Sequence, residues 1–421
     1  MLTKAPKGTR DILPADSYKW QYIENLMSNT AELFGYKEIR TPVFEHTELF
    51  QRGVGDTTDI VQKEMYTFLD KGDRSITLRP EGTAGVVRSY IEHGMSSLPQ
   101  PVKVYYNITA YRYENVQKGR YREFHQFGVE AFGAKGPQID AEIISMLSLI
   151  FEKLGLKQIR LNINSIGCPV CRKEYNQKLK EFLKPNIEKF CATCRDRYER
   201  NPLRIIDCKE EKCKEYTKDV PYLIDNLCDE CRSHFEGLKR ELSVLGISYT
   251  VDNRIVRGLD YYTKTVFEFV SDSIGAQGTV CGGGRYDGLV EECGGKPTPG
   301  IGFALGIERL LLQIESEGIE LPKRQKTSVF IASIGQTADE YAAKIVFELR
   351  KANIFAEKDT AGRSMKAQMK YADKMGADYV IVLGDDEIAN KSAIIKNMKT
   401  GEQSTINISD IKEITSYLNK V

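Results

Sequence analysis

The sequence of 421 residues lacks long apolar segments. It contains no run of about 18 apolar residues and no charged-then-apolar leader, so we expect a cytoplasmic protein with no membrane partner. An excess of charge is lacking too, because 60 Lys and Arg residues are balanced by 59 Asp and Glu residues. Any contact with nucleic acid must therefore come from local patches and not from the overall field.

Two common catalytic signatures are also missing. The phosphate-binding loop G-x-x-x-x-G-K-[ST] does not occur, although residues 275–290, GAQGTVCGGGRYDGLV, are rich in glycine. We expect this run to let the backbone pass close to a ligand or to turn a hairpin. Only four histidines are present and none has Ser-His-Asp spacing. His125 alternates out of the strand face that carries Gln126 and Glu130, so it is interpreted as structural.

Cysteine is not scarce, but it is unevenly placed. Eight of the ten cysteines lie in four close pairs: Cys168/Cys171, Cys191/Cys194, Cys208/Cys213 and Cys228/Cys231. Without an export signal, such residues are expected to be metal ligands or free thiols and not disulfides.

The spacing of these pairs predicts structural zinc. The first two pairs form C-x2-C-x19-C-x2-C, which is typical of a four-thiolate zinc site. The other two pairs form C-x4-C-x14-C-x2-C, a looser match that would complete a second site, unless the pairs interleave. Because no ligand is missing, no open position remains for water, and a catalytic metal is disfavoured. Reduced thiols left from a metal site no longer filled, or a redox switch, are the alternatives.

Residues 102–133, VKVYYNITAYRYENVQKGRYREFHQFGVEAFG, predict two strands joined by a cationic loop. The period of two places Arg112 and Glu114 on the same face of the first strand, and Gln126 and Glu130 on one face of the second. The loop contains Arg120, so an anionic ligand could be clamped there. An antiparallel sheet with one wet face explains the same pattern without a ligand.

The order of the predicted elements indicates two domains. A strand at LNINSIG is followed by the cysteine-rich segment, and strand-like sequence resumes at SYTVDNRIV, as expected for an insertion at about 168–240. The polar stretch 320–327, ELPKRQKT, is interpreted as a linker. From residue 328 strands and helices alternate, which predicts a small α/β domain at 326–421 after a larger domain at 1–325.

Arginine is the residue best suited to a nucleotide site in this chain. Arg112, Arg257 and Arg309 offer planar, permanently charged forks for phosphate oxygens. Arg257 opens the segment RGLDYYTKTVFE, in which charged and aromatic residues precede an alternating strand.

Taken together, these segments resemble the histidyl-tRNA synthetase family of class II aminoacyl-tRNA synthetases over nearly the whole chain. GYKEIRTPVF, YRYE with RYREF, and GIGFALGIERL are similar to the three class motifs, of which the first builds a dimer interface. RGLDYYTKTVFE and GGGRYDGL resemble the two histidine-specific motifs, and RPEGT with residues 126–130 resembles the amino-acid pocket. The resemblance implies an α+β fold: a class II antiparallel-sheet catalytic core with an inserted cysteine-rich subdomain, and a C-terminal α/β anticodon-binding domain.

The resemblance also assigns site residues. It implies Arg257 and Arg112 as catalytic residues, and magnesium with ATP as substrate. The residues implied for histidine are Glu81, Gly82, Thr83, Gln126, Glu130, Tyr261 and Tyr262. Those implied for ATP are Arg112, Glu114, Arg120 and Arg309.

The implied function is a histidine–tRNA ligase. It would activate L-histidine with ATP to histidyl-adenylate, transfer histidine to the 3' end of tRNA(His), and work as a homodimer. One alternative is the regulatory paralogue that binds histidine and controls ATP phosphoribosyltransferase, which usually lacks the tail domain. A second is a zinc-dependent nucleic-acid-binding module without enzymatic activity, which leaves the pocket residues unexplained.

Overall fold

The computed structural model describes residues 3–55, 58–208, 210–273, 278–323 and 328–419. The chain divides into two units, Met1–Pro322 and Lys323–Val421. The boundary predicted from the sequence, between residues 325 and 326, and part of the predicted linker lie outside the described residues, as does the start of the glycine-rich run at 275–277.

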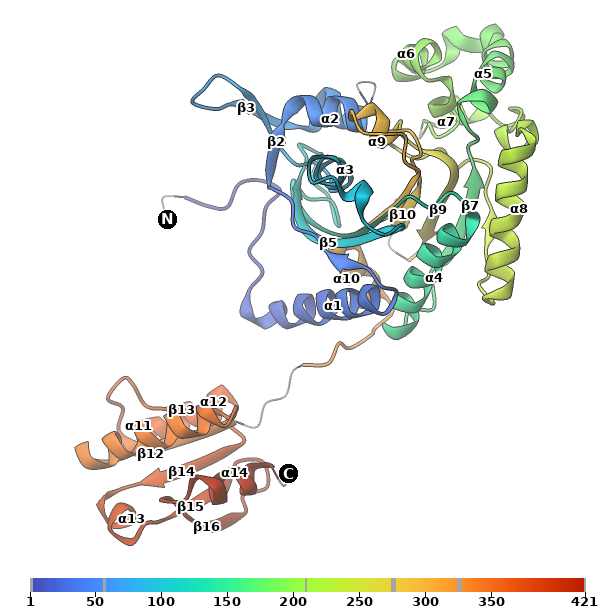
Figure 1. Cartoon of the computed structure of the whole chain (residues 1–421). Coiled ribbons are helices and arrows are strands. Elements are labelled where there is room, and N and C mark those ends of the chain that lie inside the picture. The colour runs from blue at the N-terminus through green and yellow to red at the C-terminus, as the bar shows by residue number, and fades with distance from the viewer. Residues whose placement is uncertain (1–2, 56–57, 209, 274–277, 324–327, 420–421) are drawn as a thin grey trace. The chain divides into compact units, whose positions relative to one another are not determined.

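An eight-stranded sheet forms the centre of the first unit, with the strand order β1-β5-β6-β11-β10-β9-β7-β8 (Figure 1). Its six inner strands pair antiparallel, and only the two short edge strands pair parallel. The strands are β1 (Lys37–Glu38), β5 (Val102–Tyr111), β6 (Glu123–Phe132), β7 (Arg160–Ser165), β8 (Thr250–Val251), β9 (Thr263–Val270), β10 (Thr279–Arg285) and β11 (Gly300–Gly306).

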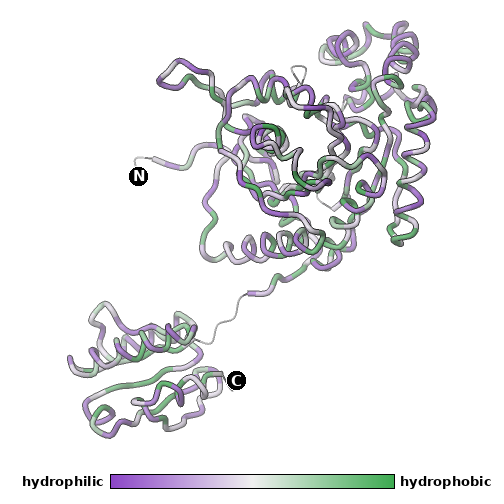
Figure 2. The backbone as a smooth tube through the Cα atoms, in the orientation of Figure 1, coloured by the Kyte–Doolittle hydropathy of each residue, from purple (hydrophilic) through white to green (hydrophobic). Residues whose placement is uncertain are grey.

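The register of β5 and β6 confirms the predicted hairpin and its faces. Ile108 pairs with Gln126 and Val104 with Glu130, so the polar residues of β6 lie beside apolar residues of β5 on one face. Tyr105, Phe127 and Val129 point to the other face. Figure 2 shows the apolar character of these central strands.

Helices cover both faces of this sheet. On one face α1 (Pro14–Leu33), α4 (Pro137–Lys153) and α10 (Ile307–Ser316) build a large apolar core with the strands. On the other face α3 (Thr83–Glu92) and α9 (Leu289–Glu292) pack with apolar residues of the insertion. Each fully buried aliphatic or aromatic side chain contributes about 1.5–3 kcal/mol through burial, so these two cores hold the sheet rigid beneath the site.

A small sheet with the order β2-β4-β3 adjoins this core. The segment KEIRTPVFEH is split into two strands: β1 ends before Pro42 and β2 begins after it, because proline cannot donate to a strand ladder. The remaining elements of this region are α2 (Thr47–Val54), β2 (Phe44–His46), β3 (Tyr66–Leu69), β4 (Ser75–Leu78), a π-helical turn (Ile60–Glu64) and the 3-10 helix η2 (Met95–Ser97).

The cysteine-rich segment lies between β7 and β8, as predicted for an insertion, and is drawn in green in Figure 1. All regular elements that the structure describes in this segment are helices. These are α5 (Pro169–Leu183), η3 (Lys184–Lys189), α6 (Ala192–Arg200), η4 (Pro202–Ile205), α7 (Glu211–Glu215), η5 (Leu223–Asn226) and α8 (Asp229–Val244).

The second unit is an α/β fold, as its alternating pattern predicted. Its sheet has the order β13-β12-β14-β15-β16, in which β12 pairs parallel with β13 and β14, and the last two strands form a hairpin. Its elements are β12 (Ser328–Ser333), α11 (Gln336–Lys351), β13 (Phe355–Lys358), α12 (Met365–Met375), β14 (Tyr379–Leu383), α13 (Asp385–Asn390), β15 (Ser392–Asn397), β16 (Gln403–Asn407) and α14 (Ile411–Asn419).

Candidate active site

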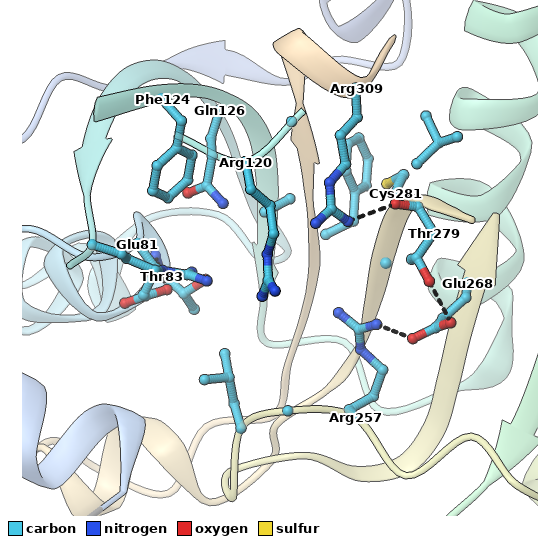
Figure 3. A pocket seen from close by; sticks show the side chains of 18 of the residues that line it. Glu81, Thr83, Arg120, Phe124, Gln126, Arg257, Glu268, Thr279, Cys281 and Arg309 are labelled. Carbon is cyan, nitrogen blue, oxygen red and sulfur yellow. Dashed lines mark hydrogen bonds and ion pairs between the residues drawn. The ribbon is translucent and has the colours of Figure 1, made fainter. Parts of the chain in front are cut away.

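A cavity of about 840 Å³ opens on the face of the large sheet that carries Gln126 and Glu130. Strands β6, β9, β10 and β11 all contribute lining residues, together with the loop after β5 and the loop before β9. Figure 3 shows Glu81, Thr83 and Gln126 on one side of it, Arg257 and Arg309 with Glu268 on the other, and Arg120 between them. The cavity therefore has two chemically different ends.

At the first end, Glu130 is only 1% exposed and accepts hydrogen bonds from three hydroxyl groups. Thr83 Oγ1 donates over 2.7 Å and the hydroxyl of Tyr106 over 3.2 Å to Oε1, while the hydroxyl of Tyr286 donates to Oε2. Burial raises the pKa of Glu130 to about 8, against the opposing effect of these hydrogen bonds. Glu130 can therefore donate its proton to a nitrogen base near neutral pH, or bind a cation as a carboxylate.

Glu81 lies beside Glu130 at the start of α3. Its carboxylate accepts from the backbone N–H groups of Thr83 (2.7 Å) and Ala84 (2.8 Å), which have no partner within the helix. Burial nevertheless raises the pKa of Glu81, because it outweighs these bonds. Two buried carboxyl groups at one end make that end a site for a cationic, hydrogen-bonding group.

At the second end, Arg112 and Arg120 flank Glu114. Arg120 Nε lies 2.6 Å from Glu114 Oε2, and Arg112 NH1 lies 3.7 Å from Oε1. Arg112 Nε also donates to the carbonyl oxygen of Pro80 over 2.8 Å, which fixes the side chain. One acidic residue is therefore shared by two cations, and this part of the wall attracts anions.

Arg257 and Arg309 complete the cationic wall (Figure 3). Arg257 forms an ion pair with Glu268, whose other oxygen accepts from Thr279 Oγ1 over 3.0 Å. Arg309 NH1 donates to the carbonyl oxygen of Thr279 over 2.9 Å. Burial and then the charge of Arg120 lower the pKa of Arg309, so these cations lie close enough to interact.

Two glycines make room for these side chains. A Cβ atom at Gly282 of β10 would overlap the guanidinium group of Arg257, and one at Gly302 of β11 would overlap the carboxyl group of Glu130. Glycine at these two positions thus leaves the space that the side chains of Arg257 and Glu130 occupy.

The structure brings nearly all predicted site residues to this one cavity. Those that line it are Glu81, Thr83, Arg112, Glu114, Arg120, Gln126, Glu130, Arg257, Tyr261, Tyr262 and Arg309. Gly82 does not line it; a Cβ atom there would overlap the ring of Tyr106, so this glycine lets the tyrosine approach Glu130.

Three residues at the site were not predicted as binding residues. Tyr106, Tyr286 and Glu268 contact Glu130 or Arg257 directly. Tyr286 and Glu268 belong to GGGRYDGL and RGLDYYTKTVFE, the segments that resemble the histidine-specific motifs, so the sequence pointed to them indirectly. Tyr106 shares the face of β5 on which Arg112 was predicted to lie. His125 is bonded to Glu308 (2.9 Å) and packs on Trp20, which agrees with a structural role.

The cysteines form two clusters of four, and their grouping differs from the one that spacing favoured. Within each cluster the sulfur atoms lie within 4.8 Å of one another. We call Cys168, Cys171, Cys228 and Cys231 the outer cluster, and Cys191, Cys194, Cys208 and Cys213 the inner cluster.

Helix packing explains this nested grouping. The first and last pairs begin α5 and α8, and packing of the insertion brings these two helix starts together, whereas α5 and η3 carry the chain away to the second pair. The spacing of the cysteines along the chain does not show that the start of α8 packs beside the start of α5.

Both clusters fit a four-thiolate metal site. Sulfur atoms lie 3.7 Å apart for Cys168 and Cys171 and 3.9 Å apart for Cys191 and Cys208, too far for a disulfide. Tetrahedral zinc with Zn–S bonds of about 2.3 Å needs edges of about 3.8 Å. Backbone N–H groups of Cys228 and Cys191 also donate to sulfur atoms, which favours thiolates.

The antiparallel sheet with its arginine-lined pocket has the fold of a class II aminoacyl-tRNA synthetase, and residues 328–416 match the profile described as an anticodon binding domain. The profile described as Histidyl-tRNA synthetase matches residues 8–170 and 208–310.

Similar proteins agree with these profiles. The chain is 72% identical over 408 residues to a histidine–tRNA ligase of Acetivibrio thermocellus, covering 97% of this chain and 98% of the relative. It is 57% identical to that of Caldanaerobacter subterraneus subsp. tengcongensis, covering 98% and 99%. The crystal structure of apo S. aureus histidyl-tRNA synthetase aligns with a TM-score of 0.84 at 47% identity, covering 100% and 99%. The chain belongs to the histidyl-tRNA synthetase family, which confirms the family and fold class predicted from the sequence.

Proposed function

We propose that this protein is a histidine–tRNA ligase, which activates L-histidine with ATP and transfers it to the 3' end of tRNA(His). The observation that carries the proposal is one cavity with a buried acidic end and an arginine-rich end. An amino acid with a basic ring and a nucleotide with a triphosphate would meet between them.

The acidic end suits histidine. Glu130 would bind one ring nitrogen of the imidazole, with Tyr262 at the other, while Glu81, Thr83 and Gln126 would surround the α-amino group and Tyr261 would line the pocket. An amino acid without these ring nitrogens would leave buried polar groups unpaired, which can discriminate by roughly 10⁴ to 10⁵ without editing.

The arginine end suits activation. The carboxylate of histidine is already ionised at neutral pH, so it attacks the α-phosphate without a general base, and pyrophosphate leaves. Arg112 and Arg257 would hold the α-phosphate and carboxylate oxygens, with Arg309, Arg120 and Glu114 on the rest of ATP. Their contribution is placement and neutralisation of charge at the phosphoryl centre.

Magnesium would enter as part of the ATP substrate. Glu114 and Glu268 supply carboxylates on this side of the cavity, the ligand type that Mg²⁺ prefers, although both are paired with arginines here. Its chemical contribution would be to neutralise charge on the triphosphate.

The second unit would recognise the anticodon side of the tRNA. The match of residues 328–416 to an anticodon-binding profile supports this role. Three exposed lysines on α12, Lys366, Lys370 and Lys374, are spaced for one helix face and supply positive charge.

We infer zinc in both cysteine clusters. The support is the set of four thiols in each, at distances that suit tetrahedral coordination. Zinc would stabilise the helical insertion and take no part in the chemistry. Metal analysis of the purified protein tests this inference, which predicts two zinc ions per chain.

A homodimer is part of the proposal. Phe44 is 56% exposed, Phe68 48% and Leu69 65%, all on the sheet β2-β4-β3, within or next to the motif that resembles the class dimer interface. Such a patch is suited to association. Analytical ultracentrifugation should give a dimer, and Phe68→Glu with Leu69→Glu should weaken it. A cytoplasmic location stays a prediction; among the described helices none is long and apolar enough to cross a membrane.

The deciding experiment is ATP–pyrophosphate exchange with each of the twenty amino acids in turn. We expect exchange with histidine alone. The alternative of a regulatory paralogue of ATP phosphoribosyltransferase predicts none; it is not favoured, because the pocket arginines and the anticodon-binding unit are present and the chain is 72% identical to a curated ligase.

A further inference from the structure

A stretch of chain between two cysteines of the inner cluster contacts the loop that carries Arg257. Residues 195–207 run between the second and third cysteines of the cluster and comprise most of α6 and all of η4. Arg197 and Arg204 of this stretch line the same cavity as Arg257. The matched family profile does not extend over residues 171–207, so this contact is made by a part of the chain outside the match.

Two hydrogen bonds join this stretch to the loop. Asn201 Nδ2 donates to Asp260 Oδ1 over 2.8 Å, and Arg204 NH1 donates to the carbonyl oxygen of Gly258 over 3.0 Å. Arg197 adds an ion pair with Asp59 at 3.4 Å. Both hydrogen bonds therefore act within three residues of Arg257.

Apolar contacts support the same junction. Leu203, Ile205 and Ile206 are buried in the cluster that also holds Val256, Tyr261 and Tyr262. The stretch and the loop thus contribute to one continuous apolar core.

The loop needs such support because of its backbone. Arg257 has a φ of +50°, a conformation that costs a non-glycine residue roughly 1–3 kcal/mol. It persists only where surrounding contacts impose it. In the loop after Arg257, Asn201 and Arg204 supply polar contacts of this kind.

The inner cluster in turn holds Asn201 and Arg204. Cys191 caps the start of α6, and its sulfur accepts from the N–H of Cys194 over 3.4 Å. The N–H of Cys208 donates to the carbonyl oxygen of Ile205 over 3.2 Å. A metal ion bound by these sulfurs would close residues 195–207 into a loop with both ends fixed, and would neutralise thiolates that otherwise repel one another.

We propose that metal in the inner cluster positions Arg257 for adenylate formation. This inference rests on the proposed function. A filled cluster holds Asn201 and Arg204 against Asp260 and Gly258, and these hold Arg257 beside Glu268. Loss of the metal releases the loop and slows the reaction while the catalytic sheet stays folded.

The first test leaves the cysteines intact. Asn201→Ala and Arg204→Met should each lower kcat for histidine-dependent pyrophosphate exchange by roughly 10- to 100-fold, the effect of a small misplacement of a catalytic group. Zinc content should not change. The matched controls are Asn226→Ala and Arg195→Met, whose side chains bond only within the insertion in the described contacts; they should stay within about twofold of the unaltered protein.

The second test empties the cluster. Cys191→Ser combined with Cys208→Ser should remove one zinc ion, and hydrogen–deuterium exchange should accelerate at residues 255–262 while β5 and β6 keep their protection. Asn201→Ala and Arg204→Met should produce the same local acceleration with both zinc ions retained.

Several results would overturn the proposal. These are an unaltered protein with no metal in the inner cluster, loss of that metal with unchanged protection at 255–262, loss of protection throughout the catalytic sheet, or Asn201→Ala and Arg204→Met variants that keep normal kcat and protection. Absence of histidine-dependent exchange in the unaltered protein would instead refute the proposed function, and hydrogen–deuterium exchange would still decide the positioning role.

Discussion

The two ends of the candidate active-site cavity differ in charge and in burial. At the acidic end Glu81 and Glu130 are 4% and 1% exposed, and burial raises the pKa of both. At the other end the side chains of Arg112 and Arg120 remain 20% and 34% exposed. The buried end is suited to selecting a ligand through unmet hydrogen bonds, and the open, cationic end to neutralising charge in a reaction.

The largest effect should come from the cationic end. Arg257→Ala should reduce histidine-dependent pyrophosphate exchange by roughly 10³-fold or more, because a fork that neutralises the phosphoryl centre is lost. The midpoint of thermal unfolding should change little. Arg160→Ala, which removes an exposed partner of Asp272, is the control. An unchanged exchange rate would remove Arg257 from the mechanism.

A second prediction separates the two units of the chain. Deleting the residues after about 326 should leave pyrophosphate exchange intact and lower kcat/KM for tRNA charging by about 10²- to 10³-fold, as for contacts worth about 3–4 kcal/mol. Both reactions should be measured on the same preparation. Equal loss of both would refute this division of labour.

A smaller effect is expected at the acidic end. Glu130→Gln should raise KM for histidine by about 10- to 100-fold, because an amide cannot accept from its three hydroxyl partners and also pair with an imidazolium. KM for ATP should stay nearly constant. If KM for ATP rose equally, the two ends would not be separate.

The smallest effect is expected for pH changes close to neutrality. Free imidazole has a pKa of about 6.5, and Glu130 has a pKa of about 8. Between these two values the free imidazole is neutral and the carboxyl group of Glu130 carries one proton. The complex of the two also holds one proton, so no proton is taken up or released on binding. KM for histidine should be flat in this window.

Outside that window the proton count changes. Above pH 8 the binding of histidine must take up a proton, and below about pH 6.5 it must release one. KM for histidine should therefore rise about tenfold per pH unit on both sides. The rise near pH 8 should vanish in Glu130→Gln. If it persisted there, the titrating group would be another one.

Much of the fold was predictable because local patterns fix it. The period of two in residues 102–133 fixed which face carries Gln126 and Glu130, and the alternation after residue 328 fixed the α/β unit. The partners of β1 and β2, on either side of Pro42, could not be predicted, because they lie in two different sheets and are set by tertiary structure.

The motifs contained residues that line the cavity, but they did not show which other residues contact them. The motifs contained Arg257, Glu268 and Glu130, whereas the contact of Glu130 with Tyr286 depends on how the strands pair. The approach of Asn201 and Arg204 to the Arg257 loop left no signal in the sequence, because their partners lie more than 50 positions away.

The sequence by itself determined the strand faces, the insertion with its eight cysteines, and the family. Each of these depends on residue type at short spacing. Only the tertiary structure decided that the first cysteine pair joins the fourth, that Glu81 and Glu130 share one buried end, and that residues 195–207 contact the Arg257 loop. These are distances through space, set by how helices and strands pack, and spacing along a chain does not contain them.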